Sequence, residues 1–487
     1  MQGNRVWFGG LVVALMLSGA PVSAQDIVTK QYDDGSVYEG TFKDGRQDGT
    51  GTYKLPNGFE YTGAWVAGEI KGMGRARYPN GSVYEGSFAA GKPVGKGKIT
   101  FADGGTYEGD WLDGAMTGQG VAHYANGSTY TGSFKGGVHD GQGSVVEASG
   151  TKYAGAWVAG VKEGKGKITY ADGTVYDGTL RAGLRAGTGT LIMPDGVTYL
   201  GDWSDGQING QGKLTQANGD VYEGQFVAGK RQGTGRVTYG NGDIYAGSFA
   251  ADKRDGTGDF TSKGGFHYVG TWVGGHMQGQ GKMTYDDGSI YEGSFAADLP
   301  QGSGKITYAD GSVYEGAWQA GVITGKGKAV YASGLIYEGD FAAAKPEGRG
   351  VMTYPDGYSY SGDWKAGIRA GQGTATYADG TVYEGQFSAG LREGKGSMTA
   401  PDGFQYVGDW KAGVMQGQGI ATYPGGDIYE GSFVNGKREG QGRLTYKAGQ
   451  ASEGVWRNGI LTAPLPTPPA PTPQTGAAAE TTTGTGN

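Results

Sequence analysis

A tyrosine recurs every 23 residues along nearly the whole 487-residue chain, and this period constrains the fold more than any other feature. The series runs from Tyr38 to Tyr429 and gives eighteen full repeats without an insertion or deletion. A partial repeat precedes it at Tyr32, and a degenerate repeat follows from Ser452. A fixed period of this kind is typical of architectures in which each unit buries its apolar face only against its neighbours.

The residues within one period alternate as β-strands require. With the recurring Tyr as position 0, Gly follows at +2 and a large ring, usually Phe or Trp, at +4. Gly returns at +11 and +13, an apolar residue usually fills +15 and Tyr usually fills +17. Asp or Asn, then Gly, end the unit at +19 and +20. Because alternate residues of a strand share a face, the rings and glycines lie on one face and polar residues on the other.

The glycine content excludes most other folds. Gly makes up 103 of the residues, and each glycine inside a helix costs about 1 kcal/mol relative to Ala, so a helical bundle is excluded. Gly does not fall on every third residue, which excludes collagen. The 32 Tyr, 15 Phe and 10 Trp are too many rings for a solvated linker. The composition therefore predicts short strands joined by tight turns.

The pattern Y-E-G-x-F/W, G-x-G and Y-x-D/N-G resembles the MORN (membrane occupation and recognition nexus) repeat. Tyr314-Glu315-Gly316-Ala317-Trp318 and the following Gly325-Lys326-Gly327 carry it clearly. The resemblance covers roughly residues 25–460 and implies an all-β fold, an elongated single-layer array of antiparallel β-hairpins with one repeat per hairpin. It also implies a precedent for dimers and for scaffolding.

The spacing predicts a strand register. We expect position 0 to pair with +17, with a hairpin loop of about four residues near +7 to +10. Gly at +20 then takes a positive φ in a three-residue turn or bulge. In this register +4 and +15 of one repeat are diagonal neighbours. Trp often occurs at +4 with Ala at +15, as in Trp318 and Ala329. We therefore expect the two side chains to pack on each other, so that a larger residue at one position goes with a smaller residue at the other.

The two ends differ from the array. Residues 1–24 are predicted to be a signal peptide: Arg5 precedes an apolar stretch at 6–17, and Val22-Ser23-Ala24 suits cleavage before Gln25. The alternative, a retained anchor, needs ~20 apolar residues. Residues 461–487 are rich in Pro, Thr and Ala and are predicted to be a disordered tail. We expect an exported protein of the periplasm or cell surface of a Gram-negative bacterium.

The sequence argues against catalysis. Cysteine is absent, which removes thiol nucleophiles and zinc–thiolate sites. The histidines occupy different repeat positions and favour neither a metal nor a catalytic site; they are His123, His139, His267 and His276. Carboxylates recur in repeat after repeat, as turn residues do, whereas an active site is singular. We expect no enzyme and no cofactor, and a net charge of −7 without basic runs predicts no nucleic-acid partner.

Two surfaces are candidate binding sites. The first is the aromatic face, whose alternative reading is the core of a thin sheet; its candidates are Tyr222, Tyr268, Trp272, Tyr291, Phe295, Tyr314, Trp318, Tyr337, Tyr360 and Trp364. The second is a set of cations near the hairpin turns that could contact an anionic surface, with solvated loops as the alternative; its members are Lys230, Arg231, Lys253, Arg254, Lys437 and Arg438.

These observations predict a non-catalytic exported scaffold that mediates protein–protein interaction or self-association in the cell envelope. The partner is then another protein or a second copy. The alternative is binding of envelope carbohydrate or lipid through the aromatic face or the basic turns.

The predicted array has a length that scattering can test. Thirty-six strands spaced by about 4.8 Å extend roughly 170 Å. Small-angle X-ray scattering of the purified protein should therefore give a rod with a maximum dimension well above about 100 Å. A compact sphere would contradict the hairpin array.

Overall fold

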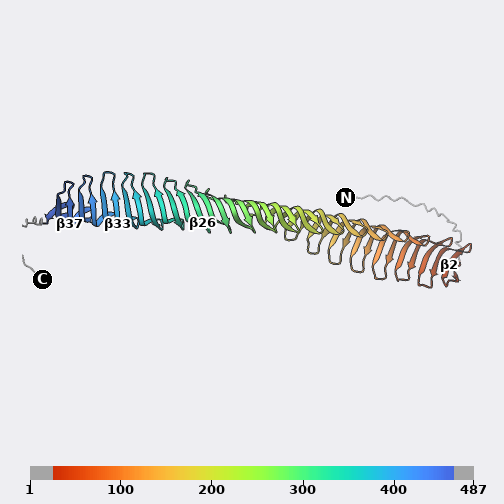
Figure 1. The fold of residues 1–487 in the computed structure, drawn as a ribbon. Helices are drawn as coiled ribbons and strands as arrows, with labels where there is room; N and C mark the ends of the chain where they lie inside the picture. Colours follow the sequence, from red (N-terminus) through yellow and green to blue (C-terminus); the bar gives the residue numbers. More distant parts are fainter. Residues whose placement is uncertain (1–25, 466–487) are drawn as a thin grey trace, which may run out of the picture. The chain divides into compact units, whose positions relative to one another are not determined.

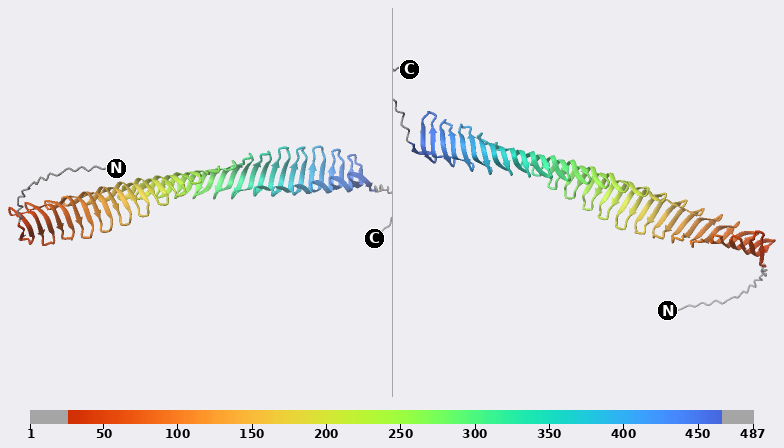
Figure 2. Two further views of the ribbon diagram at one scale, coloured as in Figure 1. Left: turned by 180° about the vertical axis from the view of Figure 1, so that it is seen from behind. Right: turned by 60° about the horizontal axis from the view of Figure 1, so that its bottom comes forward.

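The computed structural model describes residues 26–465, which form strands and turns only. They divide into two units, residues 26–240 and 241–465, and each unit is an open antiparallel sheet. Within a unit, every strand pairs with the strands that precede and follow it in the chain (Figure 1). Two further views show that the hairpins of each unit form a single layer (Figure 2). The predicted signal peptide and most of the predicted tail lie outside the described residues.

The first unit contains β1 (Val28–Gln31), β2 (Val37–Lys43), β3 (Arg46–Lys54), β4 (Glu60–Val66), β5 (Glu69–Arg77), β6 (Val83–Ala89), β7 (Lys92–Thr100), β8 (Thr106–Leu112), β9 (Ala115–His123), β10 (Thr129–Lys135), β11 (Val138–Val146), β12 (Lys152–Val158), β13 (Val161–Thr169), β14 (Val175–Arg181), β15 (Leu184–Ile192), β16 (Thr198–Ser204), β17 (Gln207–Thr215), β18 (Val221–Val227) and β19 (Lys230–Thr238).

The second unit contains β20 (Ile244–Ala250), β21 (Lys253–Thr261), β22 (His267–Val273), β23 (His276–Thr284), β24 (Ile290–Ala296), β25 (Leu299–Thr307), β26 (Val313–Gln319), β27 (Val322–Val330), β28 (Ile336–Ala342), β29 (Lys345–Thr353), β30 (Ser359–Lys365), β31 (Ile368–Thr376), β32 (Val382–Ser388), β33 (Leu391–Thr399), β34 (Gln405–Lys411), β35 (Val414–Thr422), β36 (Ile428–Val434), β37 (Lys437–Thr445), β38 (Ala451–Arg457) and β39 (Ile460–Pro464). Strand β39 thus extends four residues beyond the predicted end of the array at 460.

Each repeat is one hairpin closed by a two-residue turn. In the repeat of Tyr314, Ala320 and Gly321 form this turn with φ angles of 46° and 80°. Two positive φ values are those of a type I′ turn, whose twist matches that of paired strands. The predicted four-residue loop near +7 to +10 is therefore wrong, because the second strand already begins at +8.

Consecutive hairpins are joined by a five-residue connection that contains a three-residue turn. The Tyr308 N–H donates to the Ser312 carbonyl at 2.8 Å, and the Gly311 N–H donates to the Tyr308 carbonyl at 3.0 Å. The φ of Gly311 is 86°, so the prediction of a positive φ at +20 is confirmed.

The register differs from the prediction by two residues. Tyr314 pairs with Ala329 at +15, and Gly316 pairs with Gly327 at +13. The Tyr at +17 starts the connection instead of pairing, because the shorter turn moves the whole ladder. A shift of two residues keeps every side chain on its predicted face. A bulge between Gly316 and Trp318, with Gly325 at a φ of 65°, absorbs the extra residues of the second strand.

The core of each repeat is a tyrosine ring laid over a glycine pair. A Cβ on Gly327 would lie 2.5 Å from Cε2 of Tyr314, and a Cβ on Gly316 would lie 2.5 Å from the Tyr314 hydroxyl. Both positions therefore have to be glycine for the ring to lie flat on the sheet. The Tyr314 hydroxyl donates to the Ala317 carbonyl at 3.0 Å, which satisfies the buried oxygen.

The rings form a continuous edge-to-face series along the sheet. Tyr314 packs on Trp318 of its own repeat at a centroid distance of 5.6 Å and on Phe341 of the next repeat at 5.1 Å. The indole N–H of Trp318 donates to the Gly304 carbonyl of the preceding repeat at 3.2 Å. Each ring is thus covered by its neighbours along the row, which lets a single sheet bury one face.

The +4 ring contacts the +15 side chain of the preceding repeat, not of its own. Trp65 packs on Tyr53 at 5.8 Å, and Trp272 packs on Phe260 at 6.5 Å. Wherever a repeat has Trp at +4, the preceding repeat has a large side chain at +15. Wherever a repeat has Ala at +15, the next repeat has Phe at +4. The predicted exchange between Trp318 and Ala329 is therefore wrong, because the Trp318 indole leans over the preceding strand, where it donates to the Gly304 carbonyl, and away from the strand that carries Ala329.

The contact between repeats predicts coupling between Trp318 and Ile306. Trp318→Phe and Ile306→Ala should each lower the free energy of unfolding, by about 1–2 and about 2–4 kcal/mol. Because the two side chains occupy the positions that are in contact as Trp65 with Tyr53 and Trp272 with Phe260, the double variant should lose at least about 0.5 kcal/mol less than the sum. Amide hydrogen exchange across β26 and β27 of the full chain measures these losses. The pair Trp318→Phe and Ala329→Gly is the control and should be additive; coupling there instead would restore the rejected register.

Candidate functional site

The predicted aromatic binding face is buried. All ten of its candidates have exposed fractions between 0% and 6%: Tyr222, Tyr268, Trp272, Tyr291, Phe295, Tyr314, Trp318, Tyr337, Tyr360 and Trp364. Those of the second unit are brought together in the edge-to-face series, for example Tyr291 against Trp318 at 5.1 Å and Tyr337 against Trp364 at 5.4 Å. In this structure the rings pack against one another in the core. A ligand could contact them only by displacing the neighbouring side chains.

The predicted cationic set separates into two kinds of residue. Lys230, Lys253 and Lys437 at +8 are exposed. Adjacent residues of a strand face opposite sides, so the arginines at +9 turn towards the aromatic face instead. The structure therefore does not place the two kinds on one surface.

The arginines hold the turn of the following hairpin. The Arg254 guanidinium lies 4.0 Å from the ring centre of Trp272 and donates to the Gly275 carbonyl at 3.1 Å. Arg438 lies 4.3 Å from the Trp456 ring and donates to the Gly459 carbonyl at 2.7 Å. Arg231 lies over the ring of Tyr222 at 5.7 Å. Sequence reasoning could have found this arrangement, because Arg recurs one residue after the exposed position and faces the rings.

The acids of the turns also have a structural role. The Asp255 carboxylate accepts the Gly274 N–H at 2.9 Å, and the Glu439 carboxylate accepts the Asn458 N–H at 2.8 Å. Each acid at +10 thus satisfies a backbone N–H in the turn of the next hairpin. The recurring turn charges are therefore part of the stacking between hairpins.

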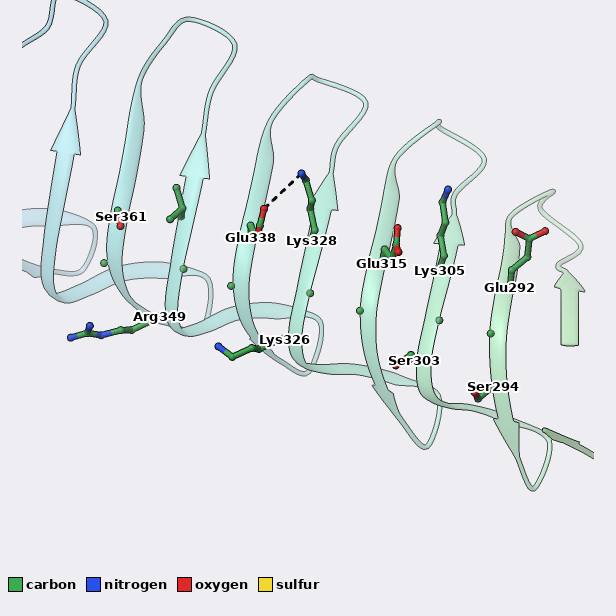
Figure 3. A pocket seen from close by; sticks show the side chains of 18 of the residues that line it. Glu292, Ser294, Ser303, Lys305, Glu315, Lys326, Lys328, Glu338, Arg349 and Ser361 are labelled. Carbon is green, nitrogen blue, oxygen red and sulfur yellow. Dashed lines mark ion pairs between the residues drawn. The ribbon is translucent and has the colours of Figure 1, made fainter. Parts of the chain in front are cut away.

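The second unit carries a groove on its polar face, which the sequence analysis did not identify (Figure 3). Its walls are the residues at +1 and +14, which alternate in charge across successive strands: Lys282, Glu292, Lys305, Glu315, Lys328 and Glu338. The paired glycines, such as Gly304 with Gly316, line it with bare backbone. The signal was present in the sequence, since Lys or Arg recurs at +14 and Glu at +1.

The charges of the groove pair with one another. Lys282 and Glu292 are 2.8 Å apart, and Lys328 and Glu338 are 3.7 Å apart. The hydrogen bond from Lys282 lowers the pKa of Glu292, so this carboxylate stays ionised at neutral pH. Exposed pairs of this kind each stabilise the fold by about 0–1 kcal/mol. Their main property is a regular, nearly neutral pattern that can be matched by a partner.

The histidines lie in separate surroundings. His139 stacks on Tyr130 at 3.6 Å, and burial lowers the pKa of its imidazole. His267 lies 2.9 Å from Asp259, and His276 lies 2.6 Å from Asp298. Within residues 26–465, no three His, Asp or Glu side chains are grouped so that they could hold a metal ion. The same residues contain no helix of the length and hydrophobicity that a membrane span requires.

The buried tyrosines predict alkaline unfolding. Burial raises the pKa of Tyr268, Tyr291 and Tyr314 to about 12, against 10.0 for a free tyrosine. The unfolded chain therefore releases these protons first, so their contribution to stability is complete below pH 10 and is lost as the pH rises towards about 12. Ultraviolet titration of tyrosinate and circular dichroism should change together in this range. Ionisation of all tyrosines near their free value, with the sheet intact, would contradict this.

The stacked arginine predicts a difference between neighbouring cations. Arg438→Ala removes the contact with Trp456 and the bond to Gly459, and should lower the free energy of unfolding of the last hairpin by about 1–2 kcal/mol. Lys437→Ala is the matched control and should change it by less than about 0.5 kcal/mol. Hydrogen exchange of β38 in the full chain makes the comparison. Equal effects of the two substitutions would argue against the stacking role.

Several solved structures resemble this chain weakly. The TCP10 domain of Danio rerio CPAP is 14% identical, with 45% of this chain and 93% of that chain covered and a TM-score of 0.21. The TCP10c domain of Drosophila melanogaster Sas-4 is 15% identical, with 41% and 99% covered and a TM-score of 0.17. A streptogramin B lyase is 14% identical, with 60% and 90% covered and a TM-score of 0.11. At these TM-scores the likenesses carry no argument about function, and no curated protein matches.

The family comparison agrees with the repeat structure. The MORN repeat matches eighteen consecutive segments between residues 38 and 451, and each segment begins at a core tyrosine such as Tyr38, Tyr314 or Tyr429. These segments cover most of the chain and coincide with the hairpins. The chain therefore belongs to the MORN repeat family.

Proposed function

We propose that this protein is a non-catalytic, exported scaffold that mediates protein–protein interaction or self-association in the cell envelope. A MORN array is a repeat scaffold that offers surfaces for binding. The observation that supports the proposal best is the polar groove of the second unit, which repeats one pattern of charge and bare backbone over several hairpins. A repeated surface suits an extended partner more than it suits a single small substrate.

The charge pattern supports a protein partner. Glu315 stands in register with Lys305 on one side and Lys328 on the other. A polypeptide with alternating charges can pair with such a ladder, and the unpaired backbone of a partner can approach the glycine rows closely. The predicted alternative, a glycan or lipid held on the aromatic face, draws no support from rings that are buried.

Site-specific cross-linking tests the scaffold role. A photo-cross-linking residue at Ser303, which lines the groove, should give a discrete protein adduct in intact native cells. The same residue at Ala320, in the exposed turn of the next hairpin, is the control and should give none. The charge reversal Glu315→Lys should weaken the adduct at Ser303. No adduct at Ser303, or equal adducts at both positions, would count against the groove.

Export has its own test. Mass spectrometry of the mature native protein should find Gln25, free or cyclised, at the amino terminus. A chain that keeps its first 24 residues would contradict the proposed export.

A further inference from the structure

A second surface of the second unit is formed by tyrosines at +17. Five consecutive repeats carry one there, and together they are called the tyrosine row: Tyr285, Tyr308, Tyr331, Tyr354 and Tyr377. Each starts a five-residue connection, and its N–H donates to the carbonyl four residues later at 2.8 Å. The five residues therefore share one backbone conformation, but their rings have different neighbours: those of Tyr354 and Tyr377 pack against Tyr358 at 5.1 Å and 5.3 Å.

The row differs from the core tyrosines in exposure and hydrogen bonding. Tyr308 is 38% exposed and the other four are half-buried. The hydroxyl of Tyr314 in the core donates to a backbone carbonyl. Within the described part of the chain, the hydroxyls of the row make no hydrogen bond. They are donors and acceptors left open to a ligand.

The first two tyrosines of the row line a common hollow. Its other lining residues are Phe266, Asp286, Asp287, Ser289 and the buried Ile306. Two aromatic walls and an apolar side chain form a slot of the kind that accepts a proline ring.

The pitch of the row matches that of a polyproline II helix. Successive tyrosines are two strands apart, which is about 9.6 Å. A polyproline II segment advances about 9.3 Å in three residues. Two prolines three residues apart can therefore meet two successive tyrosines, such as Tyr285 and Tyr308. The backbone carbonyls of such a segment have no internal partners and can accept the tyrosine hydroxyls.

The chain itself contains such a segment. Residues 464–473 read P-L-P-T-P-P-A-P-T-P and place prolines three apart twice, at Pro466 with Pro469 and at Pro468 with Pro471. No charged residue occurs between Arg457 and Glu480. The segment is thus not repelled by Asp287 and Asp310, which lie in the connections beside the row.

The distances exclude the chain's own tail from the row. Tyr377 starts the connection between β31 and β32, and β39 lies seven strands beyond β32, about 34 Å away. Residues 465–473 extend only about 28 Å as polyproline II. The segment is therefore too short to reach Tyr377, the nearest tyrosine of the row. The row of one chain can bind this segment only if a second chain supplies it.

We infer that the tyrosine row binds the proline-rich segment 464–473 of a second copy of this chain, in polyproline II conformation. This inference rests on the proposed self-association and names the surfaces that carry it. The rings hold the prolines, and the hydroxyls donate to the backbone of the segment.

Peptide binding tests the surface directly. The probe is a labelled synthetic peptide of residues 463–475, added to a full-length variant with Pro468, Pro469 and Pro471 changed to Ala, which keeps the row. Tyr308→Ala combined with Tyr331→Ala should weaken binding at least about tenfold. Tyr308→Phe with Tyr331→Phe, which keeps the packing, should weaken it by a smaller factor. Tyr124→Ala is the control and should leave binding unchanged. Tyr124 is also a tyrosine at +17 and is 40% exposed, but the +17 residues of the repeats before and after it are Phe101 and Glu147, so it is not part of a row.

Complementation then tests the second copy. Full-length protein should associate in sedimentation velocity, whereas the proline variant alone and the double Tyr→Ala variant alone should stay monomeric. Mixing the two should restore a dimer, because one supplies the row and the other the segment. Peptide binding with a monomeric wild type would overturn the second-copy assignment.

The remaining outcomes are also decisive. If the peptide does not bind, the inference fails, even if cross-linking at Ser303 still supports the scaffold role. If a soluble cell-wall glycan binds the row and the peptide does not, the surface belongs to a carbohydrate instead. If the groove gives no adduct while the peptide binds, the proposed groove fails and the row stands.

Discussion

The contact of a tyrosine ring with a pair of glycines is the interaction on which the rest of this structure depends. The ring of Tyr314 lies where the side chains of Gly316 and Gly327 would otherwise be, and its hydroxyl reaches the backbone at Ala317. Because the ring lies along the strand, it also offers an edge to the aromatic residues on both sides. The sheet needs no second layer to cover this face, since the rings cover one another.

A second set of contacts holds neighbouring hairpins in phase. The indole of Trp318 bonds to the preceding Gly304, and the Arg254 and Asp255 side chains bond to the turn at residues 274–275. These bonds join repeats that are also paired through their strands. A charged residue near a turn, which the sequence alone would place in solvent, therefore often makes a hydrogen bond to the next hairpin.

The amino-acid sequence predicts the repeat, the strand faces and the positive φ of Gly311 because each rests on a local pattern. The register could not be read from the same pattern. Pairing Tyr314 with +17 or with +15 puts the same residues on the same face, and only the turn at Ala320-Gly321 decides between them. Ala at a positive φ is unusual, but Asp44-Gly45 and Asn435-Gly436 stand at the same two positions and are pairs that a type I′ turn favours, so the short turn could have been predicted from these repeats.

The candidate site was harder to predict than the fold. Burial of Trp318 and Trp364 depends on rings from neighbouring repeats, which a single repeat does not show. The alternation of Lys and Glu was visible, but the groove that it lines exists only once Gly304 and Gly316 pair. The predicted register places the tyrosines at +17 in the second strand, whereas in the structure they start the connections at the rim of the sheet.

The bonds between turns join each hairpin to the one that precedes it in the chain. The Gly413 N–H donates to the Arg392 carbonyl, the Arg392 guanidinium donates to the Gly413 carbonyl in return, and the Trp410 indole donates to Gly396. During synthesis the earlier hairpin is already present as a template when its successor emerges. Folding can therefore advance from the amino terminus one hairpin at a time, so that only a short part of the chain is unfolded at any moment. A repeat family built in this way can lengthen by copying a unit at little cost to the hairpins that precede it.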